Sequence, residues 1–255
     1  MLFNTFRALH TTSTPLLLAN VWDVPSAKIS QKNGFKAIGT SSAALANTLG
    51  YKDGENVPFS DVLFMIEKIA SAVSVPLTVD IEAGYSEDPE VTFEHIKSLV
   101  KLGVVGINIE DSKVIGDTRS LANAEEFACF LSAIKARLSK ENIDVFINVR
   151  TDTFLLEVKD PVTETKNRIT HYQAAGADGI FIPCITNTNH IEAAVNHTHL
   201  PVNVMCMPGL TNFNELTELG VKRISMGDFV HTKQLEHFES ILLDIKKHGS
   251  FSVIF

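Results

Sequence analysis

Cysteine, basic residues and long hydrophobic runs are all scarce in this sequence. Its three cysteines, Cys129, Cys184 and Cys206, form no CxxC pair, which disfavours a disulfide framework and favours a reduced, cytoplasmic protein. With a net charge of −8, the chain lacks the basic excess of a nucleic-acid-binding protein. No apolar run approaches the ~20 residues of a membrane span, and the early run 16–19 is too short for a signal-peptide core. We therefore expect neither nucleic acid nor a membrane as a partner.

The composition that remains is typical of a globular protein with a substantial core. The 255 residues are 45% hydrophobic and 20% charged, which excludes a disordered or collagen-like chain. No low-complexity tract or long linker interrupts the sequence. We therefore expect a single domain that spans residues 1–255.

Short apolar segments alternate along the chain with longer segments of helical periodicity, which is typical of repeated βα units. We predict eight strands, at residues 16–21, 35–39, 77–81, 104–109, 145–149, 179–182, 202–205 and 223–225. The clearest helices are predicted at residues 2–9, 60–73, 89–102, 124–138, 161–175 and 234–247. This pattern predicts the α/β class and a (β/α)8 TIM barrel. The alternative, an open doubly wound sheet, would need a glycine-rich loop after the first strand, where the sequence reads VWDVP.

Carboxylates gather at the carboxyl ends of the predicted strands, where barrel enzymes place their active sites. Asp80 and Glu82 are two residues apart on one strand and therefore share a face, and Glu110 ends the next strand. Asp53 lies on a loop that can fold over the same mouth. Crowded carboxylates repel one another unless a cation lies among them, and a hard divalent ion such as Mg²⁺ suits oxygen ligands. Arg150 can bind a substrate carboxylate, so the set predicts a site for a small, doubly anionic oxo-acid.

Several neighbouring residues have simpler structural interpretations. Asp23 and Asp228 are expected to be helix N-caps. Asp111 and Asp152 are expected to form caps or ion pairs. The cysteines at strand ends are expected to be small buried hydrophobes, and none of the nine histidines has the spacing of metal ligands. Arg119, in the segment after the fourth strand, is interpreted either as a cationic contact in a closing lid or, slightly favoured, as a solvated residue.

Taken together, these motifs resemble the isocitrate lyase/phosphoenolpyruvate mutase superfamily, and the C-terminal part is similar to a phosphonomutase-like branch of it. The matching segments are 20–23 (NVWD), 34–38 (GFKAI), 49–54 (LGYKDG), 79–85 (VDIEAGY), 106–111 (GINIED), 148–152 (NVRTD) and 174–178 (AAGAD). They occur in the order and spacing of that family between about residues 16 and 185.

The resemblance implies a role for each matching residue. Asp80 would be the direct Mg²⁺ ligand, with Mn²⁺ as an alternative metal, and Glu82 and Glu110 would hold the water molecules of the metal. Arg150 would bind the substrate carboxylate, and Ser41 with the amides of Ser42 and Ala43 would bind the other anionic end. Asp53 would be an acid/base or orienting group near the metal. Family members often exchange their last helix between subunits, which implies a homodimer or homotetramer.

The lid segment departs from the family pattern. Isocitrate-lyase-type members carry a Lys-Lys-Cys-Gly-His loop, whereas residues 111–120 here contain neither cysteine nor histidine. Thr118 stands where phosphoenolpyruvate mutases have asparagine. The expected function is therefore a Mg²⁺-dependent lyase or phosphonomutase-like enzyme (of the carboxyphosphonate phosphorylmutase type) that breaks a C–C or P–C bond through an enolpyruvate. The alternatives are a catalytically retired barrel that binds a dicarboxylate and a Mg²⁺-dependent pyruvate aldolase.

Overall fold

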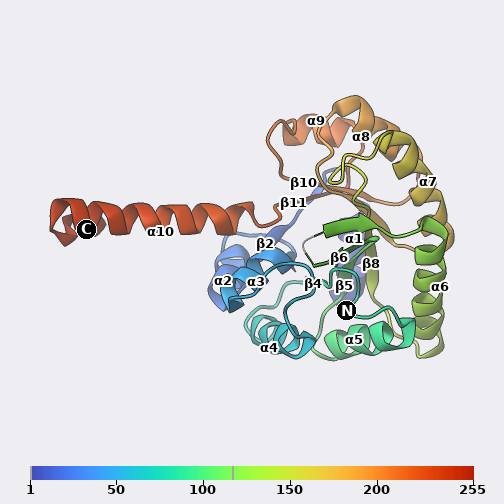
Figure 1. Cartoon of the computed structure of the whole chain (residues 1–255), viewed down its shortest axis with the longest axis horizontal. Coiled ribbons are helices and arrows are strands. Elements are labelled where there is room, and N and C mark those ends of the chain that lie inside the picture. The colour runs from blue at the N-terminus through green and yellow to red at the C-terminus, as the bar shows by residue number, and fades with distance from the viewer. Residues whose placement is uncertain (1, 117) are drawn as a thin grey trace.

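A nine-stranded parallel sheet forms the centre of the computed structural model, which describes residues 2–116 and 118–255. The strand order is β1-β11-β10-β9-β8-β5-β4-β3-β2. Since β1 (Leu16–Leu17) and β2 (Ala19–Val21) are two halves of one strand interrupted at Leu18, the two edges of the sheet meet. The sheet is therefore a closed α/β barrel, and the predicted fold class is confirmed (Figure 1).

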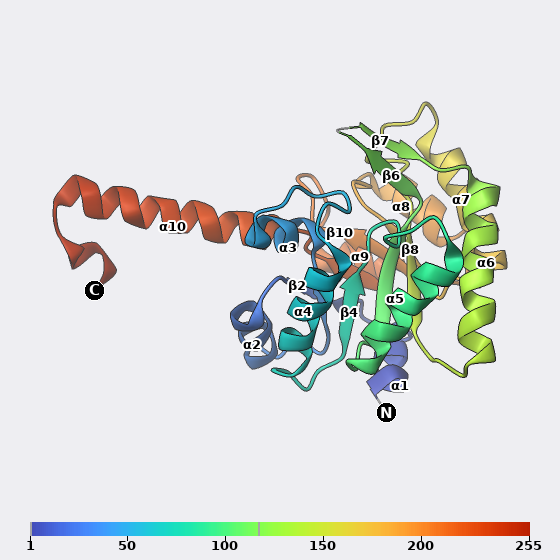
Figure 2. The ribbon, with the colours of Figure 1, turned by 60° about the horizontal axis from the view of Figure 1, so that its bottom comes forward.

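Each of the eight predicted strand segments overlaps a strand of the barrel, with ends that differ by up to three residues. Besides β1 and β2, the strands are β3 (Ile38–Thr40), β4 (Leu77–Asp80), β5 (Gly106–Glu110), β8 (Phe146–Arg150), β9 (Gly179–Ile182), β10 (Val202–Met205) and β11 (Arg223–Ser225). The helices around them are α2 (Val24–Lys32), α3 (Ser42–Leu49), α4 (Phe59–Ala70), α5 (Pro89–Lys101), α6 (Ala124–Lys140), α7 (Pro161–Ala174), α8 (Thr188–Val195) and α9 (Phe213–Glu218). The helix α1 (Leu2–Leu9) covers the N-terminal end of the barrel (Figure 2).

Side chains along each strand point alternately to the hydrophobic core and to the interior of the barrel. Val79, Ile107 and Val149 are fully buried and belong to the large hydrophobic core. Their neighbours in sequence, such as Asp80 and Arg150, have the opposite orientation, because successive side chains of a strand point to opposite faces. The carboxyl ends of β4 and β8 therefore carry their charged side chains toward the barrel axis.

Polar side chains also fill the middle of the barrel. The Nδ2 of Asn148 donates to Asn108 Oδ1 at 2.9 Å, and the buried Arg223 donates to the same oxygen at 3.2 Å. The Asn108 side chain in turn hydrogen-bonds to Asp80. A polar chain thus connects the barrel interior with the carboxylates at the mouth.

An antiparallel hairpin interrupts the βα pattern between β5 and α6. It consists of β6 (Ser112–Ile115) and β7 (Thr118–Leu121), which pair across the segment predicted as a lid. Figure 2 shows it rising at the opposite end of the barrel from α1. The lid therefore has regular structure, except that Asp117 lies outside the described residues.

The last helix leaves the barrel. α10 (Phe229–His248) extends away from it and ends in a short 3-10 helix, η1 (Phe251–Ile254) (Figure 1). The predicted final helix is thus present and begins five residues earlier than expected, at 229 instead of 234. Among the described residues, no helix is both long and apolar enough to cross a membrane.

Candidate active site

A cavity of about 320 Å³ opens at the carboxyl ends of the strands. Its walls include the predicted residues Ser41, Ser42, Ala43, Asp53, Asp80 and Arg150. Further wall residues are Asn20, Asn108, Arg119, Leu155, Phe181, Met205, Ser225, Gly227 and Asp228. The structure therefore brings together most of the site residues that the sequence suggested, and adds Arg119 to them.

Asp80 ends β4 at the floor of this cavity. Its backbone N–H donates to Thr40 Oγ1 at 3.0 Å, and its Oδ1 accepts a hydrogen bond from the backbone N–H of Glu82 at 3.1 Å. Burial raises the pKa of Asp80, and the charge of Arg150 partly opposes this rise. A buried carboxylate of this kind gains from a bound cation, because the cation replaces the lost hydration.

Glu82 follows the strand in a left-handed backbone conformation, with φ at +50°. Its Oε1 accepts from the Tyr85 hydroxyl at 3.1 Å and its Oε2 from the backbone N–H of Glu55 at 2.6 Å. The Glu55 carboxylate accepts the backbone N–H of Tyr85 at 2.6 Å. These contacts fasten the loop that carries Asp53 to the end of β4. Burial, with the nearby carboxylate of Asp53, raises the pKa of Glu82 to about 8.

Glu110 and Arg150 face each other from neighbouring strands. Arg150 Nη1 lies 2.9 Å from Glu110 Oε2, while Arg150 Nε and Nη2 contact the two carboxylate oxygens of Asp152 at 2.6 and 3.1 Å. Burial raises the pKa of Glu110 to about 7 against the opposing charge of Arg150. The predicted ion pairing of Asp152 is confirmed, and its bidentate contact fixes the direction of the Arg150 guanidinium.

A second buried ion pair, Asp111 with Arg168, holds the backbone of Asp152. Asp111 Oδ1 accepts the backbone N–H of Asp152 at 3.1 Å. Asp111 Oδ2 accepts from Arg168 Nη1 at 2.9 Å and from the Tyr172 hydroxyl at 2.6 Å. The predicted ion pairing of Asp111 is thus confirmed, and its partner on α7 could not be identified from spacing alone.

Arg119 reaches from the hairpin into the carboxylates. It contacts Glu110 Oε1 through Nη1, which also lies 2.9 Å from Ser112 Oγ and 3.2 Å from Asp152 Oδ2. Its Nη2 lies 3.4 Å from Asp53 Oδ2. The interpretation of Arg119 as a solvated residue is therefore wrong. The sequence signal that could have revealed this role is a lone arginine in a lid segment that closes over several carboxylates.

Two predicted helix caps have different outcomes. Asp23 caps α2 through a reciprocal capping box with Ser26, as expected. Asp228 occupies the N-cap position of α10, but its side chain makes no capping hydrogen bond and lines the cavity instead. The prediction of a side-chain cap at Asp228 is wrong, because the backbone there (φ −96°, ψ 0°) lacks the extended geometry that capping requires.

The N-terminus of α3 also faces the cavity. Ser41 is its N-cap, and Ser41 Oγ accepts the backbone N–H of Ala44 at 3.4 Å. Ser42 and Ala43 occupy the first turn and line the cavity. Free amides at a helix N-terminus attract anions, so this turn can hold the anionic end of a small molecule.

The carboxylate set is compatible with Mg²⁺ in one specific way. Within residues 2–116 and 118–255, no three His, Cys, Asp or Glu side chains converge into a ready metal cage. Mg²⁺, however, usually takes one or two protein carboxylates and keeps several water molecules. Asp80 can supply the direct oxygen. Glu110 Oε2 is buried and makes no hydrogen bond within the described residues, although it forms an ion pair with Arg150 Nη1 at 2.9 Å. The residues therefore fit a hydrated Mg²⁺ held mainly by Asp80.

A family model described as phosphoenolpyruvate phosphomutase matches residues 6–246. The chain belongs to the phosphoenolpyruvate mutase family. It is 35% identical over 231 residues to the uncharacterized protein Rv1998c of Mycobacterium tuberculosis, covering 91% of this chain and 84% of that one. It is 29% identical over 226 residues to oxaloacetate decarboxylase 1 of Pseudomonas fluorescens, covering 85% and 75%. The resemblance that the sequence motifs indicated is thus confirmed.

Solved structures agree with this assignment. A suggested phosphonomutase from Burkholderia cenocepacia J2315 is 35% identical, with a TM-score of 0.89 over 94% of this chain and 98% of that one. A phosphonopyruvate hydrolase solved with oxalate and Mg²⁺ is 23% identical, with a TM-score of 0.87 over 100% and 90%. The family contains lyases and mutases that act on C–C or P–C bonds.

The raised pKa of Glu82 predicts an unusual pH dependence for the metal-free protein. Between its ordinary value of 4.5 and its folded value of about 8, the folded state keeps a proton that the unfolded chain has released. The free energy of unfolding should therefore fall as pH rises through this window, by at most ~1.4 kcal/mol per pH unit from this group. Calorimetry from pH 5.5 to 8 should show a falling melting temperature, and Glu82→Gln should flatten the curve. Glu90→Gln, which removes an exposed carboxylate, is the control. If the melting temperature depends on pH equally steeply in wild type and in Glu82→Gln, the prediction is refuted.

Proposed function

We propose that the protein is a Mg²⁺-dependent enzyme that cleaves or rearranges a C–C or P–C bond next to a 2-oxo or 2-hydroxy group, through an enolpyruvate intermediate. The observation that carries this proposal is the meeting of Asp80, Glu82 and Glu110 with the Arg150 guanidinium at one mouth of the barrel. Its substrate would be a small 2-oxo acid, dicarboxylate or phosphonate. Oxaloacetate decarboxylase 1 and the phosphonopyruvate hydrolase illustrate the two bond types within similar proteins.

The metal-binding residues would act at the 2-oxo end of the substrate. Asp80 would bind Mg²⁺ directly, and Glu82 and Glu110 would accept hydrogen bonds from its water molecules. The bound metal would stabilise negative charge on the 2-oxo oxygen. When the neighbouring C–C bond breaks, CO₂ or a carbonyl fragment would leave and a proton would be added to the carbon of the enolate. When a P–C bond breaks, the phosphoryl group would pass to water or to the enolate oxygen. Mn²⁺ can take the same oxygen ligands.

Arg150 would bind the carboxylate next to the 2-oxo group. A guanidinium has five N–H donors. Arg150 Nε and Nη2 donate to Asp152, and Nη1 forms an ion pair with Glu110 Oε2. One donor on each terminal nitrogen stays available, and Arg150 lines the cavity. That arrangement suits bidentate recognition of a carboxylate.

The first turn of α3 would bind the other end of the substrate. Ser41 with the amides of Ser42 and Ala43 would hold its second carboxylate or its phosphonate. Asp53, on the loop fastened to Glu82, would orient the substrate or transfer a proton at the reacting carbon. Both anion sites line the cavity that also contains Asp80, so a substrate held at its two ends would lie within reach of Asp80.

A turnover screen tests this function. The protein is incubated with Mg²⁺ and with oxaloacetate, phosphonopyruvate, 2-methylisocitrate or 2,3-dimethylmalate, and the 2-oxo acid products are measured. We expect one substrate to be turned over, with activity lost on chelation by EDTA and restored by Mg²⁺. Binding of Mg²⁺ and oxalate without any turnover would favour the retired barrel, and turnover that EDTA does not affect would contradict the proposed mechanism.

The projecting α10 supports a homo-oligomer. Phe238, Leu242 and Leu243 on this helix are 58%, 50% and 59% exposed, and Phe251 in η1 is 65% exposed. Apolar side chains in such number are rarely left in water, so we propose that a second copy of the chain covers them in a homodimer or homotetramer.

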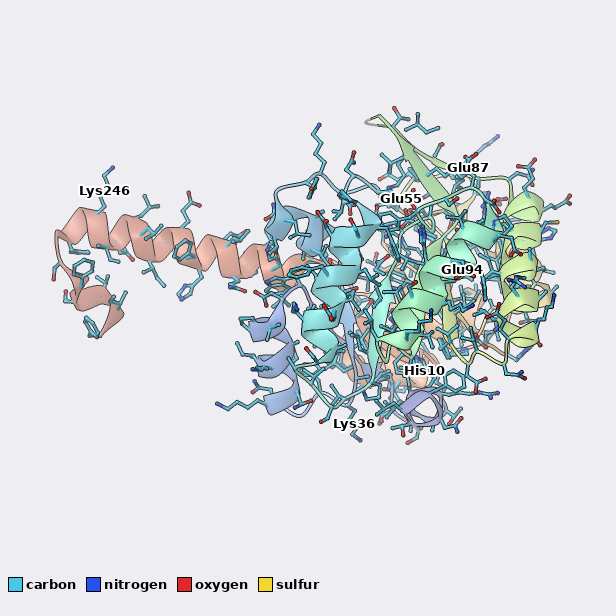
Figure 3. The ribbon with its side chains drawn as sticks, turned by 90° about the horizontal axis from the view of Figure 1, so that it is seen from below. His10, Lys36, Glu55, Glu87, Glu94 and Lys246 are labelled. Atoms are coloured by element: carbon cyan, nitrogen blue, oxygen red, sulfur yellow. The ribbon has the colours of Figure 1, made fainter. Side chains whose placement is uncertain are left out.

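Phe238→Asp should therefore convert the oligomer into monomers. A charge in a buried apolar contact between subunits costs several kcal/mol, which is enough to separate a moderately stable dimer. Light scattering coupled to size exclusion measures the mass, with Lys246→Asp at the charged end of the same helix (Figure 3) as the control. A wild-type protein that is already monomeric at micromolar concentration would contradict this proposal.

A further inference from the structure

We propose that Arg119 is an exchangeable internal cation: it holds the hairpin closed on Glu110 and Asp53 until a metal bound at Asp80 offsets the charge of these carboxylates, and it then pairs with the substrate. This inference rests on the proposed metal site and adds a binding order to it, with metal before substrate.

Arg119 occupies the oxygens that a hydrated metal would need. Both carboxylate oxygens of Glu110 face guanidinium groups, Oε1 that of Arg119 and Oε2 that of Arg150. Asp53 Oδ2 also faces Arg119, at 3.4 Å. A carboxylate oxygen that already contacts a guanidinium cannot equally well accept a hydrogen bond from metal-bound water.

The hairpin and the loop of Asp53 close over the mouth as one unit. A Cβ on Gly54 would lie 2.9 Å from Val114 Cβ, so the loop packs directly against β6 at a position that only glycine fits, with φ at +98°. The Arg119–Asp53 ion pair bridges the same two segments. Glu55, on this loop, lies at the hairpin end of the barrel, whereas His10 lies at the opposite end beside α1 (Figure 3).

Among the described residues, few other polar contacts hold the end of the hairpin in place. At its base, Ser112 Oγ donates to Asp152 Oδ2 at 2.5 Å. Toward the tip, Ile115 is 76% exposed, and Lys113 pairs with Glu87, whose side chain is 84% exposed. An ion pair that is so exposed contributes little. The half-buried Arg119 is therefore the main polar attachment of the hairpin to the mouth of the barrel.

Once a metal bound at Asp80 offsets the charge of Glu110 and Asp53, their attraction for Arg119 weakens. Arg119 keeps Asp152 as a partner, but Asp152 is already paired with both Nε and Nη2 of Arg150. The guanidinium then becomes available to an anionic group that enters the mouth. The hairpin should accordingly loosen when metal binds alone and close again when metal and a dianion bind together.

Hydrogen–deuterium exchange of the wild-type protein tests this order without any mutation. We expect amides of β6 (Ser112–Ile115) and β7 (Thr118–Leu121) to exchange several-fold faster with saturating Mg²⁺ than with EDTA, and to become protected again when oxalate is added to the Mg²⁺ protein. Amides of α6 serve as the internal reference. Slower exchange, or no change, on addition of Mg²⁺ alone would overturn the proposal.

Calorimetric titration with Mg²⁺ is the second test. Arg119→Gln should bind Mg²⁺ about tenfold more tightly than wild type, because the competing charge is gone. Lys113→Gln, which removes a cation from the same hairpin outside the site, should leave the affinity unchanged. Weaker or equal Mg²⁺ binding by Arg119→Gln would overturn the inference alone, whereas a failure of every variant and of wild type to bind Mg²⁺ would overturn the proposed metal site as well.

Discussion

Asp80→Asn should abolish measurable Mg²⁺ binding and lower kcat by at least about 10³-fold on whichever acid the protein turns over. Asp80 is the carboxylate at the floor of the cavity, and a neutral amide cannot replace the charge that a hard cation needs. The substitution keeps the size of the side chain, and an amide oxygen can still accept the Glu82 N–H at the place of Oδ1. The fold should therefore stay intact. The measurement is Mg²⁺ titration calorimetry together with steady-state kinetics at saturating Mg²⁺.

The matched control for this experiment is Asp23→Asn. Asp23 also follows a barrel strand, but its carboxylate caps α2, and asparagine caps helices as well as aspartate does. We expect its activity and Mg²⁺ affinity to stay within about twofold of wild type. An Asp80→Asn protein that keeps a tenth or more of wild-type kcat would remove Asp80 from the metal site.

Arg168→Met should cost about 3–5 kcal/mol of unfolding free energy at neutral pH. The substitution leaves Asp111 fully buried without a cation, although the Tyr172 hydroxyl and the backbone N–H of Asp152 still donate to it. A buried carboxylate that loses its cation destabilises the protein far more than the methionine gains by packing. The loss of unfolding free energy should be smaller at low pH, because protonation of Asp111 removes the uncompensated charge. Urea denaturation at pH 5 and pH 7.5 measures both effects.

Arg137→Met is the surface counterpart of this variant. Arg137 pairs with Glu90 at 2.8 Å and with Glu141 at 3.3 Å, but its side chain is 28% exposed. Such pairs are worth about 0–1 kcal/mol, so we expect a change within that range. In the double variant Asp111→Leu/Arg168→Met, stability should partly recover. If Arg137→Met and Arg168→Met lower the unfolding free energy equally, the buried Asp111–Arg168 pair does not have the importance assigned to it.

The barrel and most of its mouth could be predicted because they depend on local signals. Each strand is a short apolar run bounded by turn residues, and parallel strands place their carboxyl ends at one face of the barrel. Asp80, Asp53 and Arg150 therefore could be assigned to one cavity before the structure was known. The Asp23 cap followed from the sequence for the same reason, since its partner Ser26 is three residues away.

The rest depends on contacts between distant parts of the chain. Arg119 reaches Asp53, which is 66 residues earlier in the chain, and Asp111 meets Arg168, which is 57 residues later. No local periodicity encodes these pairs. Asp228 illustrates the opposite error: its position before a helix is typical of a cap, but the local backbone turns its side chain toward the cavity.

The measurement that tests the central claim most directly is deuterium exchange at the methyl group of pyruvate, followed by proton NMR in D₂O. An enolpyruvate formed at this site should exchange these protons whatever the leaving group of the natural substrate is. We predict exchange that requires both the protein and Mg²⁺ and that is lost in Asp80→Asn. Exchange at the buffer rate with the Mg²⁺-saturated protein, although pyruvate binds, would contradict the enolpyruvate mechanism.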